Sequence, residues 1–431
     1  MSGPDRPMTD WSARVLAEVD ARLPETFELL AELVRIPSVS GSDPEHEIQA
    51  RLAGELAAAG LEVDHWRISL DELIAEPEFP GVEVDRQEAW GLVGRLPASS
   101  SGGGSLLLNG HVDVVPIGNP AAWSRPDAFS GQIVGDTLFG RGACDMKAGL
   151  VAALAAVQAV RRLGVPLRGE LMLACVPGEE DGGLGSYAML RRGWRADACV
   201  VPEPTGLDLV TANAGALTFR LRVPGRATHA SRRSEGVSAV EKFLPVLAAL
   251  QALEAASNAS VDPLMARWPL AYPLSIGRLV AGDWASSVPD LLVAEGRLGV
   301  VLDEPMDTAR SALETAVAEA CAADPWLRDH PVTVEWWGGQ FASGRLPASS
   351  DLADRMAAAH SAVGGGTLQT SGAPYGSDLR LLSGIGGIPT LHYGPGDALL
   401  AHAPDERVPL AEVATAARAL ALLALDICGT A

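Results

Sequence analysis

LLLNGHVDVVP, residues 106 to 116, is an apolar run that ends abruptly in polar residues. A short, continuous apolar run is typical of a strand that is buried on both faces of a sheet. Its end carries the imidazole of His111 and the carboxylate of Asp113, which point the same way because side chains two residues apart on a strand share a face. The stretch therefore predicts a central strand that delivers an imidazole and a carboxylate to the edge of a sheet.

Further apolar runs repeat this pattern along the chain. They are residues 171–176 followed by PGEE, residues 198–201 followed by PEP, and residues 389–393 followed by GPG. Helical stretches such as residues 146–163 alternate with these runs, as is typical of a largely parallel sheet covered by helices on both faces. Ligands bind beyond the carboxyl ends of the strands in such sheets, so we expect the polar residues there to share one crevice.

The pattern changes between about residues 215 and 340. Residues 216–223 alternate between apolar and polar side chains, as a half-exposed strand does, and the segments after them predict the order βαββαβ. That order is typical of a ferredoxin-like α+β domain. We therefore expect residues 215–340 to form a small domain inserted into a larger one, which is built from residues 1–214 and 341–431.

The remaining segments complete the larger domain. Apolar residues at helical spacing predict helices over residues 11–35, 44–60, 351–363 and 410–427. Residues 67–88 are acidic and interrupted by proline, so we expect an excursion over the surface.

The composition limits the partners of this chain. A length of 431 residues with 48% hydrophobic residues suggests two or three domains, and two is our expectation. The formal net charge of −21 disfavours nucleic acids and anionic membrane surfaces as partners. No run reaches the roughly 18 uninterrupted apolar residues of a spanning helix. The five scattered cysteines and an N-terminus unlike a signal or transit peptide predict a soluble, cytoplasmic protein.

The polar residues expected at the strand ends are imidazoles and carboxylates without thiolates. They are His111, Asp145, Glu179, Glu180, Glu203 and His402. This mixture suits zinc, cobalt or manganese in a catalytic site, whereas closed structural zinc sites usually contain cysteine. Five ligands and a water could hold two ions about 3.5 to 4 Å apart if one carboxylate bridges them.

Each of these residues also has an ordinary explanation when it is taken alone. Asp145 directly precedes a long helix and could cap its free amides. Glu179 and Glu180 could lie in a solvated turn, although a shared cation would leave one of them free as a general base. His402 could be an ordinary loop histidine. Their joint occurrence at the strand ends of one sheet favours a metal site.

Five motifs together resemble the dinuclear zinc deacylase and exopeptidase family, which includes aminoacylase, acetylornithine deacetylase, succinyl-diaminopimelate desuccinylase and carboxypeptidase G. The motifs are GHVDVVP (110–116), GRGACDMKAG (140–149), PGEEDGG (177–183), PEPT (202–205) and AHAPDE (401–406). The resemblance covers nearly the whole chain, including the position of the inserted domain. It implies an α/β fold like that of zinc exopeptidases, with the ferredoxin-like domain serving as a lid and dimerisation domain.

The resemblance implies two divalent metal ions in each subunit, zinc first, with cobalt or manganese as alternatives. His111 and Glu203 would hold one ion, Glu180 and His402 would hold the other, and Asp145 would bridge both. Metal coordination lowers the pKa of water from 15.7 to about 7, so a metal-bound hydroxide would attack an amide without a covalent acyl-enzyme.

The resemblance also implies roles for residues that do not bind metal. Glu179 would be the general base that takes a proton from the attacking water and passes it to the leaving amine. Asp113 would orient His111 as a hydrogen-bond partner outside the metal ligands. His229, in GRATHAS, would cross a dimer interface to stabilise the oxyanion in the partner's active site, a role worth about 3 to 4 kcal/mol in comparable sites. A histidine in a basic turn is the alternative.

The chain departs from the family where substrates bind. Ser286 stands where many relatives have an asparagine, and Arg297 lies two or three residues before the position at which many have a substrate-binding arginine. The remaining candidates for lining the pocket are Tyr375, Ser377, Asp378, Arg380 and the turn from Gly394 to Gly396. Turn geometry alone could explain the glycines.

We therefore expect a metal-dependent amidohydrolase, similar to acetylornithine deacetylase, that removes an acyl group from an N-acyl amino acid or a related amine. The partners would be this small molecule and a second copy of the chain, bound through residues 215–340. A dipeptidase or carboxypeptidase of the same family is the alternative for the substrate. A non-catalytic binding protein is disfavoured because Glu179 and all five ligand positions are intact.

Overall fold

The predicted central strand is β3 (Leu106–His111), and it lies inside a mixed sheet in the computed structural model, which describes residues 10–431. Within those residues the sheet has nine strands, in the order β1-β2-β6-β3-β7-β15-β8-β13, with β14 beside β8. The other strands are β1 (Glu62–Arg67), β2 (Trp90–Leu96), β6 (Leu171–Val176), β7 (Ala198–Val201), β8 (Leu209–Asn213), β13 (Gly344–Arg345), β14 (Thr370–Ala373) and β15 (Thr390–His392). The strands β6, β3, β7 and β15 run parallel to one another, which confirms the mostly parallel sheet.

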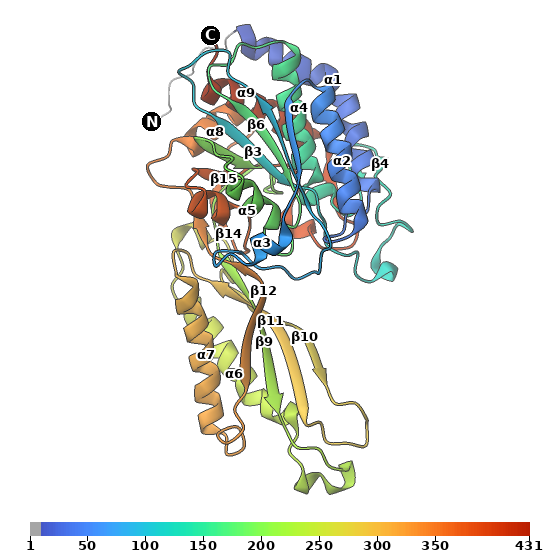
Figure 1. The fold of residues 1–431 in the computed structure, drawn as a ribbon, viewed down its shortest axis with the longest axis vertical. Helices are drawn as coiled ribbons and strands as arrows, with labels where there is room; N and C mark the ends of the chain where they lie inside the picture. The colour runs from blue at the N-terminus through green and yellow to red at the C-terminus, as the bar shows by residue number, and fades with distance from the viewer. Residues whose placement is uncertain (1–9) are drawn as a thin grey trace.

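Helices cover both faces of this sheet (Figure 1). Leu106 and Leu108 of β3 join a core formed with α1 (Asp10–Arg35), α2 (Asp43–Ala58), α4 (Ala148–Arg162), α8 (Leu352–Ala362) and α9 (Leu410–Cys428). Leu107 points the other way, into a second core with α3 (Leu70–Ile74) and α5 (Leu184–Arg191). Successive side chains of a strand face opposite sides, so this division shows that β3 is buried between two helical layers.

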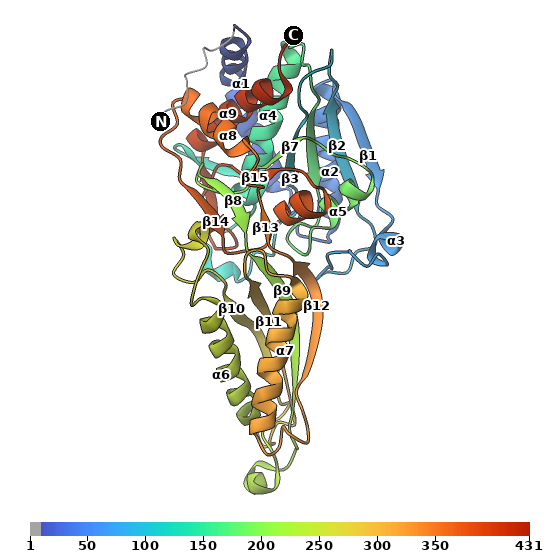
Figure 2. The same ribbon diagram turned by 90° about the vertical axis from the view of Figure 1, so that its left-hand side faces the viewer.

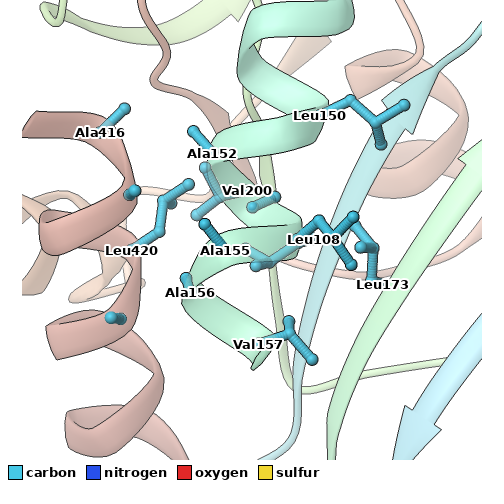
Figure 3. Packing of buried hydrophobic residues seen from close by; sticks show 14 of the residues in the cluster. Leu108, Leu150, Ala152, Ala155, Ala156, Val157, Leu173, Val200, Ala416 and Leu420 are labelled. Atoms are coloured by element: carbon cyan, nitrogen blue, oxygen red, sulfur yellow. The ribbon is translucent and has the colours of Figure 1, made fainter. Parts of the chain in front are cut away.

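Helix α4 lies between the sheet and α9 (Figure 3). Its alanines, including Ala152, Ala155 and Ala156, allow Ala416 and Leu420 of α9 to approach closely. By length and composition, residues 143–162 could cross a membrane, but 89% of that apolar window is buried within the protein. The hydrophobicity of α4 is therefore that of a core helix.

The small domain has the predicted order βαββαβ. Its elements are β9 (Gly215–Pro224), α6 (Ala239–Ser257), β10 (Leu274–Ala281), β11 (Leu291–Val300), α7 (Met306–Ala323) and β12 (Thr333–Phe341). The strands form an antiparallel sheet in the order β10-β11-β9-β12, with both helices on one face (Figure 2). The ferredoxin-like arrangement is thus confirmed, and the domain extends away from the large one (Figure 1).

Some features differ from the sequence expectations. Neither β1 nor β2 was predicted, nor was the small sheet formed by β4 (Gln132–Val134), β5 (Thr137–Phe139) and β16 (Arg407–Pro409). Most of the expected surface excursion over residues 67–88 is exposed or half-buried, as predicted, but the Arg86 side chain turns inward and is only 3% exposed. Residues 1–9, where we expect no signal or transit peptide, lie outside the described part of the chain.

Candidate metal centre

Neighbouring strands bring the predicted ligands to one edge of the large sheet. His111 is the last residue of β3, Glu179 and Glu180 lie in the turn after β6, and Glu203 follows β7. Because β6, β3 and β7 are adjacent and parallel, their carboxyl ends lie side by side. The structure therefore brings together residues that are far apart in the sequence, since Glu203 lies 92 positions after His111.

Two further predicted ligands reach the site from irregular segments. Asp145 lies in a single wide helical turn, η2 (Ala143–Lys147), where its backbone is not helical, with φ −115° and ψ 98°. His402 follows η6 (Ala398–Leu400) and has a positive φ of 59°. A non-glycine residue in this left-handed region is uncommon and is often found at functional sites.

The Asp145 carboxylate lies between two histidines. Its Oδ1 atom is 3.1 Å from Nε2 of His111, and its Oδ2 atom is 3.5 Å from Nε2 of His402. Each histidine also has a glutamate neighbour: Glu203 Oε1 is 3.9 Å from His111 Nε2, and Glu180 Oε2 is 3.0 Å from His402 Nε2. Two histidine–glutamate pairs thus face one central carboxylate, as a bridged pair of cations requires.

The potential ligand atoms form two groups, and His111 belongs to both. One atom each from His111, Asp145 and Glu180 lies within 4.8 Å of the others, and the same is true of His111, Glu179 and Glu203. His111 is 1% exposed and Glu203 is 5% exposed, so the oxygen and nitrogen donors face one another rather than solvent. Nitrogen and oxygen donors without a thiolate fit zinc, cobalt or manganese.

The electrostatics of the centre favour a positive charge among the carboxylates. Burial, reinforced by neighbouring carboxylates, raises the pKa of Glu179 and Glu203 well above the ordinary value. Burial opposes protonation of His402, but Asp145 and Glu180 outweigh it and raise the pKa of this imidazole to about 11. Divalent cations would meet the same demand for positive charge, so these residues fit a metal centre.

Asp113 contacts both His111 and the turn that carries the paired glutamates. Its backbone carbonyl lies 2.9 Å from Nδ1 of His111, whereas its carboxylate Oδ1 is 3.7 Å from that nitrogen. The carboxylate accepts the backbone N–H groups of Glu179 at 3.1 Å and Glu180 at 3.3 Å, and the hydroxyl of Ser40 at 2.7 Å. The main chain of Asp113 thus orients the imidazole, while its side chain holds the glutamate turn.

Glu406 was not predicted from the sequence. It is fully buried and accepts the backbone N–H groups of Cys144 at 2.9 Å and Asp145 at 3.0 Å. The buried guanidinium of Arg141 donates to its other oxygen at 2.6 Å. Glu406 therefore fixes the backbone of the central carboxylate. Its position four residues after His402, in the same motif, was the signal that could have revealed it.

The predicted pocket residues of the large domain lie near the centre but differ in their contacts. Arg380 is buried and donates to the carbonyls of Ser377 at 3.1 Å and Gly182 at 2.7 Å. Burial, reinforced by the charges of Glu203, Asp145 and Glu179, raises the pKa of the Tyr375 hydroxyl well above its ordinary value.

The two predicted glycines pack against other backbone segments. A Cβ atom on Gly394 would lie 2.3 Å from the carbonyl oxygen of Pro202, directly before the ligand Glu203. Gly396 has φ +95°, and a Cβ there would lie 2.8 Å from the Cys144 sulfur. Glycine at these positions allows the chain to pass close to the segments that carry two ligands.

The predicted residues of the small domain are not brought to the metal centre of the same chain. The segment that joins β9 to α6 and contains His229 lies at the end of the small domain that is far from the large sheet (Figure 1). The Ala230 N–H there donates to the Ser286 carbonyl at 2.7 Å, so Ser286 lies beside this segment. The ten residues of β9 that lead there span roughly 33 Å. Arg297 lies closer to the large domain and pairs with Glu83 at 2.7 Å.

Several known proteins are similar to this chain in sequence and in fold. The model for Peptidase family M20/M25/M40 matches residues 107–426. N-formyl-4-amino-5-aminomethyl-2-methylpyrimidine deformylase of Halalkalibacterium halodurans is 25% identical over 437 residues, which cover 96% of this chain and 97% of that protein. Succinyl-diaminopimelate desuccinylase of Methylobacterium sp. (strain 4-46) is 37% identical over 217 residues, or 48% of this chain and 50% of that protein.

The fold is also similar to that of human carnosine dipeptidase 1. The two structures superpose with a TM-score of 0.74 at 15% identity, covering 97% of this chain and 99% of that one. The likeness extends over both domains.

Proposed function

Because the chain belongs to Peptidase family M20/M25/M40, we propose that it is a deacylase that removes an acyl group from the nitrogen of an amino acid or a related amine. Membership confirms the resemblance seen in the motifs and makes the chain a metal-dependent hydrolase that acts on C–N bonds. The observation that carries the proposal is the Asp145 carboxylate between two histidine–glutamate pairs, with Glu179 beside them.

In this proposal His111 and Glu203 would hold one divalent ion, His402 and Glu180 would hold the other, and Asp145 would contribute to both sites. Zinc fits this donor set best, and cobalt and manganese are alternatives. When bound, such ions polarise the amide carbonyl and lower the pKa of water.

Glu179 is the general base in this proposal. Glu179 is 7% exposed, and burial raises the pKa of its carboxyl group, so it can hold a proton between two steps of the reaction. It takes a proton as water adds to the amide carbon, and it gives that proton to the nitrogen as the C–N bond breaks. The products are a carboxylic acid and a free amine.

An acyl group that is not an amino acid is favoured because of the relatives. The deformylase aligns with this chain over nearly the whole length of both proteins. The desuccinylase aligns over about half of its own length, but with a higher sequence identity. Both names describe removal of a small acyl group from nitrogen.

A substrate panel tests this proposal. The protein is reconstituted with zinc, cobalt or manganese and offered N-formyl, N-acetyl and N-succinyl amino acids, an N-formylated aminomethyl heterocycle, and a set of dipeptides. We expect the highest kcat/KM on an N-acyl compound. A higher value on dipeptides would replace the deacylase proposal with a dipeptidase, and no turnover of any amide would overturn both.

Substitution of the general base gives a second test. Glu179→Ala is expected to retain two metal ions per chain and to lose about 100-fold to 10,000-fold in kcat, the range typical of a general base. Metal content is measured by elemental analysis and kcat by product release. Glu180→Ala is the matched control, because it removes a ligand and is expected to lose metal. Full activity of Glu179→Ala would contradict its role.

We also propose a homodimer formed through residues 215–340, in which His229 acts in the partner's site, and a cytoplasmic location. The homodimer is supported by the segment that joins β9 to α6 and contains His229, because this segment lies far from the large sheet of its own chain. All five cysteines of the chain lie in the described part and are buried free thiols, which supports a reducing compartment.

A further inference from the structure

Residues 80–86, which we call the strap, contact both the small domain and the turn that carries Glu179 and Glu180. The strap belongs to the large domain in sequence and lies directly before β2. It forms part of the segment that the sequence suggested to be a surface excursion, and most of its residues are half-buried.

One end of the strap is hydrogen-bonded to the small-domain sheet. The Pro80 carbonyl accepts the N–H of Gln340 at 2.8 Å. The Glu83 carboxylate accepts the hydroxyl of Thr218 at 2.8 Å and forms an ion pair with Arg297 at 2.7 Å. Thr218, Arg297 and Gln340 belong to β9, β11 and β12, so the strap contacts adjacent strands of that sheet.

The other end of the strap holds the turn that contains the glutamates. Arg86 donates from Nη2 to Asp181 at 2.9 Å and from Nη1 to Glu45 at 2.6 Å. Glu45 in turn accepts the N–H of Gly178 at 3.0 Å, and Asp181 also accepts the N–H of Val84 at 3.3 Å. Arg86, Glu45 and Asp181 have side chains that are 3%, 0% and 5% exposed, so solvent does not replace these bonds.

Gly178 and Asp181 enclose the two functional glutamates, because Glu179 and Glu180 are the residues between them. Arg86 therefore holds both ends of the turn, one through Asp181 and the other through Glu45. Asp113 holds the middle of the same turn through the two glutamate amides.

Gly81 of the strap packs closely against two backbone segments. A Cβ atom on Gly81 would lie 2.0 Å from the Gly338 carbonyl oxygen of the small domain. A Cβ atom on Gly182, in the glutamate turn, would lie 2.0 Å from the Gly81 carbonyl oxygen. Because no side chain separates these segments, a shift of the Gly338 backbone would be transmitted through Gly81 to Gly182.

We propose that Arg86 is a positioning residue for Glu179 and Glu180, and that the strap makes their placement depend on the position of the small domain. The proposal rests on the proposed function in so far as it treats Glu179 as the general base. Arg86 contacts neither substrate nor metal in this scheme, and acts through Asp181 and Glu45.

Two substitutions test the two ends of the strap independently of each other. Arg86→Lys keeps a positive charge but replaces the planar fork, whose arms reach Asp181 and Glu45, with a single ammonium. Glu83→Gln keeps the shape of the small-domain contact and removes its ion pair with Arg297. Arg345→Lys is the matched control, because Arg345 also bridges two carboxylates, at 2.7 Å and 2.9 Å, and neither belongs to the strap or the turn.

The test combines kinetics with hydrogen exchange of the metal-loaded protein. Arg86→Lys is expected to lower kcat about tenfold or more with little change in KM and with full metal content. Amide exchange over residues 178–183 is expected to rise clearly. Glu83→Gln is expected to cause a smaller change of the same kind, and Arg345→Lys none. If Arg86→Lys does not fold, Asp181→Asn removes the same ion pair from the other side.

The outcomes distinguish this inference from the proposed function. Unchanged exchange over residues 178–183 in folded Arg86→Lys or Asp181→Asn would overturn the positioning role. Unchanged exchange there in Glu83→Gln would overturn the dependence on the small domain. Exchange is measured without substrate, so it remains decisive even if Glu179→Ala keeps full activity and the proposed reaction is wrong.

Discussion

Asp113 shows how one residue can serve the centre through its main chain and its side chain at once. Its carbonyl orients the His111 imidazole, and its carboxylate accepts two amides of the glutamate turn and one hydroxyl from Ser40. All three neighbours of this side chain are hydrogen-bond donors, and both oxygens of a carboxylate can accept. A carboxylate is therefore required here as an acceptor and not only as a charge.

Asp113→Asn tests this requirement. The amide offers one oxygen and one NH2 group, so either the Glu179 N–H, or both the Glu180 N–H and the Ser40 hydroxyl, would face a donor. We expect activity to fall about 10-fold to 100-fold, as for other residues that support metal ligands, with weakened but not abolished metal binding. Activity and metal content are measured together with those of His111→Ala, which should lose the metal centre.

Ser40→Ala is the control for Asp113→Asn. It removes one donor to the carboxylate and leaves both backbone amides with their acceptor. We expect less than about a threefold loss of activity, consistent with the modest net value of one hydrogen bond. Wild-type activity in Asp113→Asn would show that the glutamate turn does not depend on this carboxylate.

At the scale of single residues, the sequence predicted the residues whose chemistry is distinctive and missed those that support them. His111, Asp145 and Glu203 are polar residues next to buried runs, which makes them conspicuous. Arg86 gave no such signal, because its segment is acidic and interrupted by proline. Its importance depends on which carboxylates lie opposite it, and that information is available only from the folded chain.

At the scale of elements, α4 begins two residues later than the helical pattern suggested. Met146 was expected to be helical, but the peptide groups around Asp145 leave the helix so that the side chain can enter the centre while Glu406 holds its N–H. The periodicity of apolar residues predicts which face of a helix packs against the core. The start of α4 depends instead on the non-helical backbone that directs the Asp145 side chain into the centre.

Gly149, in the first turn of α4, tests how closely this helix packs against the Pro202 turn. A Cβ atom there would lie 1.8 Å from the carbonyl oxygen of Pro202, the residue before the ligand Glu203. We expect Gly149→Ala to lower stability by about 1 to 3 kcal/mol, as overpacking does, and to weaken metal binding. Thermal unfolding with and without metal measures both effects.

Gly54→Ala in α2 is the matched control for that substitution. Nothing lies within 4 Å of a Cβ at Gly54, so alanine gains its helical preference without a clash. We expect stability to rise by about 0.5 to 1 kcal/mol. Equal melting temperatures for the two variants would contradict the close contact between α4 and the Pro202 turn.

Strand β2 was not predicted because the contacts that explain its glycines come from distant parts of the sequence. Its sequence WGLVGRL contains two glycines, which normally argue against a strand. A Cβ on Gly91 would lie 2.1 Å from the ring of Trp66 in β1, and one on Gly94 would lie 2.9 Å from Leu56 of α2. The glycines make room for large neighbours, and these neighbours are distant enough in sequence to leave no local pattern.

At the scale of the whole molecule, the inserted domain was predictable because its alternating strands differ from the continuous apolar strands around it. The βαββαβ order follows from local periodicity. The distance of the segment after β9, which contains His229, from the large sheet could not be read from that periodicity, since it depends on the direction in which β9 leaves the large domain.

Mixing two inactive variants tests the proposed dimer. His229→Ala and Glu179→Ala are each expected to have low activity as homodimers. After dissociation and reassociation in equal amounts, half of the dimers are mixed, and each contains one site with both residues intact. We expect about a quarter of the wild-type activity per chain to return, as random pairing in a two-fold dimer requires. No recovery in dimers that have exchanged subunits would exclude action across an interface.

The glycine contact among Gly81, Gly182 and Gly338 limits how the protein can be redesigned. A chimaera that received the small domain of a relative would place a foreign backbone against Gly81, where the surrounding carbonyl oxygens leave no room for a Cβ atom. The interchangeable unit is therefore discontinuous in sequence. Residues 80–86 must be transplanted together with residues 215–340 for the glutamate turn to keep its shape.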